Sequence, residues 1–254
     1  MKIDFSGKVA LVTGGACGIG QAICLEFANV GARVVCVDIN EAAGLETVAR
    51  IRGTGGESIF LRADVTEAAS VSSYVDSTLA AYGRIDAFSN NAGYEGQVRS
   101  TVDYSIDEFD RVMAINVRGV FLGLKYVLPV MLRQRSGAVI NTGSTGSHIG
   151  ATGVCAYTAS KHAVLGLTRT AALEVAGSGV RVNAICPGGT QTRMLQSLTE
   201  GRNQSEQLAF NTATPNGRIA EPHEIAAMVV FLASDYASHM VGQSVIMDGG
   251  RLAM

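Results

Sequence analysis

A short apolar run followed by a glycine-rich turn constrains this chain more than any other feature. Residues 9–20 read Val-Ala-Leu-Val-Thr-Gly-Gly-Ala-Cys-Gly-Ile-Gly, and Ile19, Ile23 and Phe27 then share one face of a predicted helix. A strand, a tight turn and a helix N-terminus form an anion site, because free N–H groups and the positive dipole end face the ligand. Glycine permits close backbone approach and positive φ. The stretch predicts a pyrophosphate-binding turn, with an ordinary glycine-rich turn as the alternative.

The glycine spacing, T-G-x-x-x-G-x-G, differs from two common phosphate-binding patterns. Ile23 stands where G-x-G-x-x-G requires its last glycine, and Gln21 stands where a Walker A loop requires lysine. The turn therefore needs support from the rest of the chain.

Six further apolar runs alternate with helical patterns along the chain. They are residues 34–37, 59–61, 85–88, 138–140, 180–185 and 244–247. Runs that are apolar on both faces are typical of a buried parallel sheet with right-handed helical crossovers. We predict one α/β domain over residues 1–254, a doubly wound (Rossmann-like) seven-stranded parallel sheet with helices on both faces. Ligands of such sheets bind at the carboxyl ends of the strands, near the switch in strand order.

Composition and charge narrow the function classes. The net charge is −2 and basic residues form no run, which argues against nucleic-acid and membrane-surface partners. We expect no transmembrane run and no signal peptide. Five cysteines without a C-x-x-C pair fit a reduced, cytoplasmic setting, with Cys24, Cys36 and Cys186 in apolar core stretches. The four scattered histidines lack metal-ligand spacing, so no metal is expected.

An aspartate ends the second predicted strand. Asp38 follows Gly20 by 18 residues, close to the ~20 expected of a carboxylate that binds a ribose diol. The alternative is a loop cap or turn former. No Arg or Lys stands at Cys17, Ile39 or Asn40 to receive a 2′-phosphate.

Three further polar features follow predicted strands or interrupt a predicted helix. Asp64 has two compatible interpretations, an acceptor for an adenine amino group and an N-cap for a helix starting near Thr66. The stretch 90–93, Asn-Asn-Ala-Gly, suits close backbone approach to a ligand or an ordinary turn. Asn116 lies on an apolar stretch inside a predicted helix over about 107–135. Because asparagine is unfavourable there, it is either a satisfied core amide or a functional residue.

A serine, a tyrosine and a lysine complete the candidate chemistry. Ser144 ends the fifth predicted strand, and Tyr157 and Lys161 follow on a helix. Positions i and i+4 share a helix face, so phenol and ammonium can point the same way. A free tyrosine, with a pKa of ~10, is a poor base at neutral pH. A nearby ammonium and a cationic nicotinamide ring would lower that pKa. The alternative is a core tyrosine and a solvated lysine.

Jointly these features resemble the short-chain dehydrogenase/reductase family, in its single-domain branch. The resemblance covers essentially the whole chain through Thr13-Gly14, Gly18-Ile19-Gly20, Asp38, Asp64-Val65, Asn90-Asn91-Ala92-Gly93, Asn116, Ser144, Tyr157 with Lys161, Pro187-Gly188 and Asp248-Gly249-Gly250. It implies an NAD-dependent oxidoreductase that interconverts a secondary alcohol and a ketone by hydride transfer.

The resemblance also implies a role for each matching residue. Tyr157 is the expected acid/base, Ser144 binds the substrate oxygen, Lys161 binds the nicotinamide ribose, and Asn116 holds a relay water. Cys17 departs from the polar or basic residue frequent at its position, which weakens an NADP interpretation. The expected cofactor-binding residues are Gly14, Cys17, Gly18, Ile19, Gly20, Asp38, Ile39, Asp64, Val65, Asn91, Ala92, Gly93, Tyr157, Lys161, Pro187, Gly188, Thr190 and Thr192.

A polar, irregular segment at about residues 190–215 is predicted to be a substrate lid. An ordinary surface excursion is the alternative. Besides Ser144 and Tyr157, the substrate-pocket candidates are Glu95, Gln97, His148, Val154 and Met194. Glu95 and His148 are equally compatible with solvated loop positions.

Two other functions stay open. An NADP site and a basic patch would indicate a 3-oxoacyl-[acyl-carrier-protein] reductase. Loss of a catalytic residue would indicate a non-catalytic dinucleotide sensor.

The helices near 107–135 and 155–176 carry more apolar positions than one sheet face covers, including Phe121, Leu124, Val127, Leu128, Val164, Leu165, Leu167 and Leu173. In the family such helices pair across a two-fold axis, so a homotetramer is expected.

Overall fold

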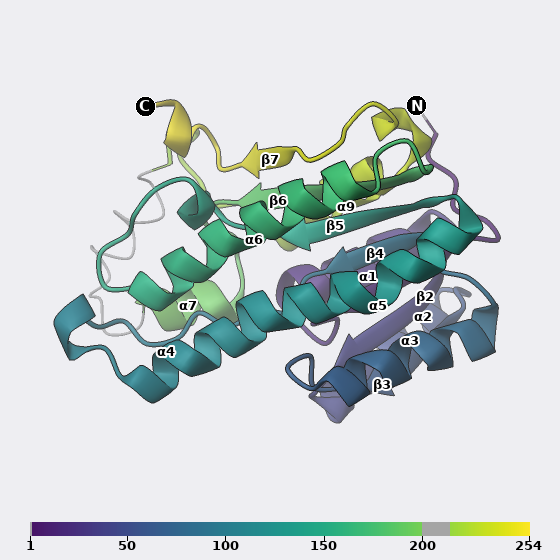
Figure 1. Ribbon diagram of the computed structural model, residues 1–254, viewed down its shortest axis with the longest axis horizontal. Coiled ribbons are helices and arrows are strands. Elements are labelled where there is room, and N and C mark those ends of the chain that lie inside the picture. The colour runs from purple at the N-terminus through teal and green to yellow at the C-terminus, as the bar shows by residue number, and fades with distance from the viewer. Residues whose placement is uncertain (1, 200–213) are drawn as a thin grey trace.

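A parallel sheet forms the middle layer of the molecule (Figure 1). The computed structural model describes residues 2–199 and 214–254, and within them seven strands pair in the order β3-β2-β1-β4-β5-β6-β7. The strands are β1 Val9–Thr13, β2 Arg33–Asp38, β3 Ser58–Arg62, β4 Ala87–Asn90, β5 Gly137–Thr142, β6 Val180–Pro187 and β7 Ser244–Met247. Every neighbouring pair is parallel. The predicted fold class is confirmed.

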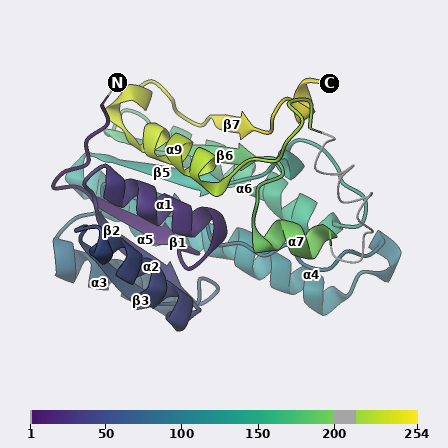
Figure 2. The ribbon, with the colours of Figure 1, turned by 180° about the vertical axis from the view of Figure 1, so that it is seen from behind.

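Helices cover both faces of this sheet. One face carries α3 (Ala68–Tyr82), α5 (Gly119–Gln134) and α6 (Cys155–Glu174) (Figure 1). The other carries α1 (Gly18–Asn29), α2 (Glu41–Gly53) and α9 (Pro222–Ala233) (Figure 2). Among the residues that the structure describes, the other two α-helices are α4 (Ile106–Met113) and α7 (Arg193–Thr199), which follows β6. The helix α4 runs through a π-helical turn at Ala114–Arg118 into α5.

Successive side chains along each strand point to opposite faces of the sheet, so the core consists of two halves. On β1, Val9 and Leu11 face the α3–α5–α6 layer, whereas Ala10 and Val12 face the α1–α2–α9 layer. All four are completely buried. Because both faces of the strand are covered, it reads as a continuous apolar run rather than an alternating one.

The order of strands reverses between β1 and β4. From β1 the chain builds outward to β2 and β3, and then returns to place β4 on the other side of β1. The carboxyl ends of these two neighbouring strands carry the glycine-rich turn and the Asn91 loop. This is the switch point at which doubly wound sheets bind their ligands.

The predicted helix over 107–135 forms a continuous helical segment, Ile106–Gln134. It is long and apolar enough by length and composition to span a membrane, which corrects the expectation that no segment reaches that length. Half of its most apolar window is buried inside the fold, and α5 packs against α3, β4 and β5. A core helix of this kind meets the same criteria.

Candidate active site

The glycine-rich turn packs directly on the loop that follows β4. Gly14 has φ +65°, and a Cβ at this position would lie 2.9 Å from the Cα of Ala92. A Cβ on Gly20 would lie 2.0 Å from the carbonyl oxygen of Gly14. Only glycine fits these two positions, because any side chain would collide with backbone atoms. The first N–H groups of α1 have no acceptor within the helix. The residues that carry them, Gly18, Ile19 and Gly20, line a large cavity.

Hydrogen bonds tie this turn to its neighbours. The Thr13 hydroxyl accepts from the backbone N–H groups of Asn91 (3.0 Å) and Ala92 (3.1 Å). The Asn91 amide donates to the Thr13 carbonyl at 3.1 Å and accepts from the Thr142 hydroxyl at 3.2 Å. The ends of β1, β4 and β5 are therefore held together around one amide.

Two aspartates line the same cavity near the glycine-rich turn. Asp38 ends β2 and accepts hydrogen bonds from the N–H groups of Ala16 (3.0 Å) and Asn40 (2.9 Å). Asp64 accepts from both the N–H and the hydroxyl of Thr66. The N-cap interpretation of Asp64 is wrong, because α3 begins at Ala68 with Glu67 before it. Asp64 instead closes a local turn that aims its backbone at the cavity.

Asn116 is a buried and fully bonded amide. Its oxygen accepts from the Tyr94 N–H at 2.8 Å, and its nitrogen donates to the Tyr94 carbonyl (2.8 Å) and the Ser160 hydroxyl (3.0 Å). It lies in the π-helical turn between α4 and α5. A Cβ on Gly93 would lie 3.5 Å from both the Asn116 oxygen and the Lys161 Nζ. The Asn116 amide is therefore fully hydrogen-bonded within the core, and Gly93 is the residue that lies near both it and Lys161.

Ser144, Tyr157 and Lys161 meet at the end of β5. The Ser144 hydroxyl accepts from the Gly146 N–H at 3.1 Å, and it lies close enough to the Tyr157 phenol to act on the pKa of Tyr157. Lys161 is 4% exposed, and its Nζ donates to the Thr142 carbonyl at 2.7 Å. The same Nζ lies 5.5 Å from the centroid of the Tyr157 ring.

Burial shifts the pKa values of both titrating groups. It lowers the pKa of Lys161 to about 8, because the ammonium is poorly solvated. It also raises the pKa of Tyr157 above 10, and the charge of Glu95 raises it further, although the Ser144 hydroxyl acts in the opposite direction. The lowering of the Tyr157 pKa expected from two cations, the Lys161 ammonium and a nicotinamide ring, is not produced by the protein's own groups, because burial outweighs the effect of Ser144.

One cavity of about 1340 Å³ collects most of the predicted site residues. Glu95, Val154 and Met194 line it, but Gln97 and His148 do not, which corrects those two substrate candidates. Its lining also includes Gly14, Cys17, Gly18, Ile19, Gly20, Asp38, Ile39, Asp64, Val65, Asn91, Ala92, Gly93, Ser144, Tyr157, Lys161, Pro187, Gly188, Thr190 and Thr192. A glycine-edged cavity running from Asp38 to Tyr157 fits an elongated dinucleotide.

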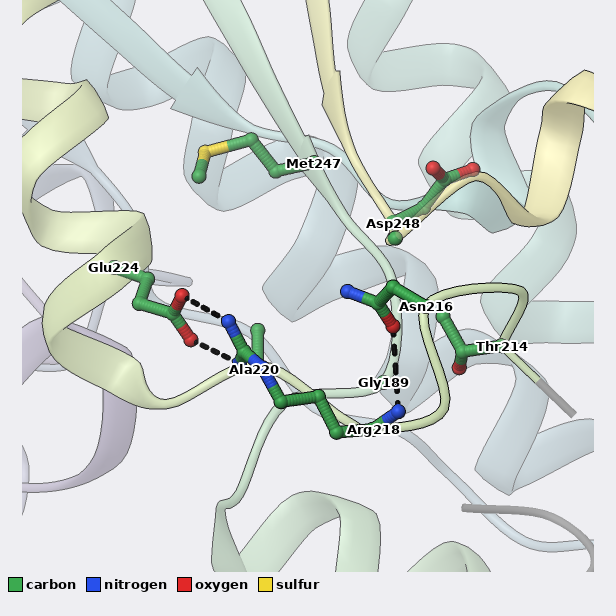
Figure 3. Close-up of a pocket in the computed structure, with 9 residues that line it drawn as sticks. Gly189, Thr214, Asn216, Arg218, Ala220, Glu224, Met247 and Asp248 are labelled. Atoms are coloured by element: carbon green, nitrogen blue, oxygen red, sulfur yellow. Dashed lines mark hydrogen bonds and ion pairs between the residues drawn. The ribbon is translucent and has the colours of Figure 1, made fainter. Parts of the chain in front are cut away.

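A smaller pocket of about 160 Å³ lies beside Gly189 and Thr214 (Figure 3). At its rim the Arg218 guanidinium forms a bidentate ion pair with Glu224, at 2.6 and 2.7 Å. That ion pair, together with a backbone hydrogen bond, lowers the pKa of Glu224 to about 2. No predicted catalytic residue lines this pocket, so the larger cavity is the candidate active site.

The predicted lid contains a helix, which corrects its description as irregular. The helix α7 begins at Arg193, and its Met194, Leu195 and Leu198 line the cavity. The Ser197 hydroxyl donates to the Glu95 carboxylate at 2.6 Å, which joins α7 to the loop after β4. Phe210 and the rest of 200–213 lie outside the described residues.

Sequence reasoning missed three cationic residues that line the cavity, Arg111, Arg193 and Arg251. The Arg111 guanidinium stacks 4.8 Å from the centroid of the Tyr94 ring. Arg193 follows Thr192, the last predicted nicotinamide contact, so its position after β6 was the available signal. Ser160, the partner of Asn116, was also missed, because its hydrogen bond spans 44 residues.

Comparisons with known proteins agree with this geometry. A family model described as "Enoyl-(Acyl carrier protein) reductase" matches residues 14–251. Levodione reductase from Leifsonia aquatica is 42% identical, covering 98% of this chain and 96% of its own length. Cyclopentanol dehydrogenase from Comamonas sp. is 40% identical, with 97% of each chain covered.

Solved structures give the same result. The crystal structure of levodione reductase superposes with a TM-score of 0.95 at 40% identity, covering 98% of this chain and 99% of the other. That of NAD+-bound xylitol dehydrogenase superposes with a TM-score of 0.91 at 36% identity, covering 97% and 99%. The fold and the arrangement of the site therefore have enzymatic relatives along their whole length.

The buried Lys161 gives a testable pH dependence of stability. Its pKa is about 8 in the folded chain and near 10.5 in water, so between these values the unfolded chain binds more protons. The free energy of unfolding of the wild type should therefore rise with pH through this window, relative to Lys161→Met. The difference amounts to at most ~3 kcal/mol, at ~1.4 kcal/mol per pKa unit.

Urea unfolding of both proteins at several pH values from 7.5 to 10 measures this difference. The variant Lys125→Met, which removes an exposed lysine, provides the reference for the loss of one ammonium group. A difference between wild type and Lys161→Met that stays constant with pH contradicts the assignment.

Proposed function

The chain belongs to the short-chain dehydrogenase/reductase family, and we propose that it interconverts a secondary alcohol and a ketone with NAD(H) as cofactor. The observation that carries the proposal is that Ser144, Tyr157 and the buried Lys161 line the same cavity as the glycine-rich turn, with the Lys161 Nζ 5.5 Å from the centroid of the Tyr157 ring. Relatives named levodione reductase and cyclopentanol dehydrogenase support the reaction class.

The proposed chemistry places each side chain in a distinct role. The nicotinamide ring supplies the hydride chemistry when it is bound. Ser144 and Tyr157 donate hydrogen bonds to the substrate oxygen, on which negative charge develops. In oxidation Tyr157 takes the alcohol proton, and in reduction it returns a proton to the same oxygen. Both roles require the phenol of Tyr157 and the hydroxyl of Ser144 to reach the same substrate oxygen, and both side chains line the cavity.

Lys161 and Asn116 act behind Tyr157 in this proposal. The Lys161 ammonium is anchored by the Thr142 carbonyl at 2.7 Å, so its position is fixed. The Asn116 oxygen and the Lys161 Nζ are both 3.5 Å from the point where a side chain on Gly93 would begin, so the two atoms lie no more than twice that distance apart. Lys161 then binds the nicotinamide ribose, and Asn116 lines the route by which protons reach the phenol.

The substrate end of the cavity favours a small, mainly apolar alcohol or ketone. Its lining includes the side chains of Val98, Ile149, Val154, Met194 and Leu198. A panel of cyclic and open-chain secondary alcohols and ketones, followed by NADH absorbance, tests this class. The panel includes a 3-oxoacyl thioester and an enoyl thioester, because the matching family model is described as an acyl-carrier reductase.

The Tyr157→Phe variant tests the acid/base assignment. It removes the only phenolic proton at the reacting oxygen, so turnover should fall by at least ~100-fold, the usual size of an acid/base contribution. The dissociation constant of NADH, measured by fluorescence titration, should change little, because the ring itself stays. Substantial turnover by the variant would show that another group moves the proton.

Asp38 supports a preference for NAD(H) over NADP(H). Its carboxylate stands at the cavity edge on two backbone N–H groups, where it can also accept from ribose hydroxyls. A 2′-phosphate would bring about two negative charges beside it. Binding of NADP would also lose charge-assisted hydrogen bonds of roughly 1.5–3 kcal/mol each. The lost bonds and the repulsion both weaken NADP binding relative to NAD binding. A preference of at least ~100-fold follows at ~1.4 kcal/mol per tenfold.

Values of kcat/KM with both cofactors measure the preference. Asp38→Asn removes the charge and keeps one side-chain oxygen, so the N–H of either Ala16 or Asn40 loses its acceptor. The variant should narrow the cofactor preference, and its melting temperature measures the effect of the lost hydrogen bond on the turn. An added Ile39→Arg substitution should move the preference further towards NADP. Equal values for the wild type, or a preference for NADP, would mean that Asp38 does not face the ribose.

We also propose that the protein is a homotetramer, although fewer exposed apolar residues support this assembly than the sequence suggests. Leu124, Val127, Val164 and Leu165 are buried within the chain's own core, which removes them from the expected surplus of apolar positions. Phe121 and Leu173 are 47% and 77% exposed. Both lie on helices of the α3–α5–α6 layer and support pairing through that layer.

Light scattering on dilute protein tests the assembly. A mass near four times the chain mass of 26.4 kDa is expected. Phe121→Asp should lower it, whereas Leu45→Asp, an exposed leucine on α2 in the opposite layer, should not. A wild-type mass near that of one chain contradicts the proposal.

A further inference from the structure

The first turn of α7 lies against the first turn of α1. A Cβ on Gly18, the first residue of α1, would lie 3.3 Å from the Thr192 Cγ2. Thr192 in turn holds the start of α7, because its hydroxyl accepts from the Leu195 N–H at 3.3 Å. The segment after β6 therefore reaches the glycine-rich turn and positions the next residue, Arg193, at the same end of the cavity.

The positive charge of Arg193 acts electrostatically on the glycine-rich turn. Arg193 is exposed and lines the large cavity together with Cys17, Gly18 and Ile19. Burial and, to a smaller extent, the carboxylates of Asp38 and Glu95 raise the pKa of the Cys17 thiol, and the Arg193 guanidinium is the cation that acts against them. Cys17 is the residue that precedes α1. The guanidinium therefore lies within electrostatic range of the α1 N-terminus.

The start of α1 has no negative charge of its own. The first turn of the helix contains no acidic residue, and the Cys17 side chain forms no capping hydrogen bond. The free N–H groups and the positive end of the helix dipole are thus available to an anion. Arg193 adds a full positive charge from the opposite wall, and its planar guanidinium matches two phosphate oxygens at once.

We propose that Arg193 binds the pyrophosphate of the dinucleotide from the α7 side and completes the anion site that α1 begins. The inference rests on the proposed function, because it assumes that a dinucleotide occupies the cavity. The same helix holds Glu95 at the substrate side through Ser197. A single seven-residue helix then contacts both the cofactor phosphates and the loop that borders the substrate.

Calorimetric titration with fragments of the dinucleotide tests the proposal without any turnover. The probes are ADP-ribose, which carries the pyrophosphate, adenosine, which carries no phosphate, and 2′,5′-ADP, which carries a 2′-phosphate but no pyrophosphate. Arg193→Gln should weaken ADP-ribose binding about tenfold, as expected for one charge-assisted hydrogen bond, and should leave adenosine unchanged. Arg193→Lys should recover part of the loss.

Arg111→Gln provides the matched control. Arg111 is also an exposed arginine of the cavity lining, but it is stacked on Tyr94 at the substrate side. This variant should bind ADP-ribose like the wild type. Equal melting temperatures of the three variants and the wild type exclude a loss of folding as the cause.

Three results overturn the proposal. Arg193→Gln with unchanged ADP-ribose affinity shows that the guanidinium does not touch the pyrophosphate. An equal loss for adenosine and ADP-ribose shows a structural role, and a loss confined to 2′,5′-ADP shows that Arg193 binds a 2′-phosphate instead. A wild type that reduces ketones with NADH while Arg193→Gln binds ADP-ribose normally refutes this inference alone. A wild type that binds neither NADH nor ADP-ribose refutes the proposed function as well.

Discussion

The hydrogen bonds between Thr13 and Asn91 are the contact on which the rest of the site depends. They join the carboxyl ends of β1 and β4, where the order of strands reverses, and Asn91 also reaches β5 through Thr142. Each bond contributes only about 1 kcal/mol, but leaving a partly buried amide unpaired costs 1–3 kcal/mol. The loops are therefore held in one arrangement, in which Ala92 closes on Gly14 and the start of α1 stays accessible. Such preorganisation lowers the entropy that a ligand loses on binding.

Local sequence patterns were sufficient for the fold and for most of the candidate site. Apolar runs and the glycine turn identified the sheet and its switch point, because parallel strands buried on both faces leave that signature. The predicted run at 85–88 is displaced from β4, which starts at Ala87. Ile85 instead exchanges backbone hydrogen bonds with the Gln134 side chain, a partner 49 residues away that no local pattern reveals.

The errors at the site have a common physical cause. His148 is a candidate for the substrate pocket by sequence, but it follows a short helical turn at Thr145–Ser147 and does not line the cavity. Leu124 and Val164 were counted as surplus, yet the α3–α5–α6 layer buries them against the sheet. Asn116 could not be decided from sequence, since its partners Tyr94 and Ser160 lie 22 and 44 residues away. In each case tertiary contacts, rather than local preference, fixed the outcome.

Burial moves the two titrating groups of the site in opposite directions. It disfavours the ammonium of Lys161 and the phenolate of Tyr157 alike, so one pKa falls to about 8 while the other rises above its usual value. Lys161 cannot compensate, because its Nζ is held by the Thr142 carbonyl, 5.5 Å from the centroid of the ring. The protein's own groups therefore keep the phenol protonated at neutral pH, ready to donate beside Ser144. The proposed base role of Tyr157 would therefore require additional positive charge in the cavity, beyond what the protein's own groups supply.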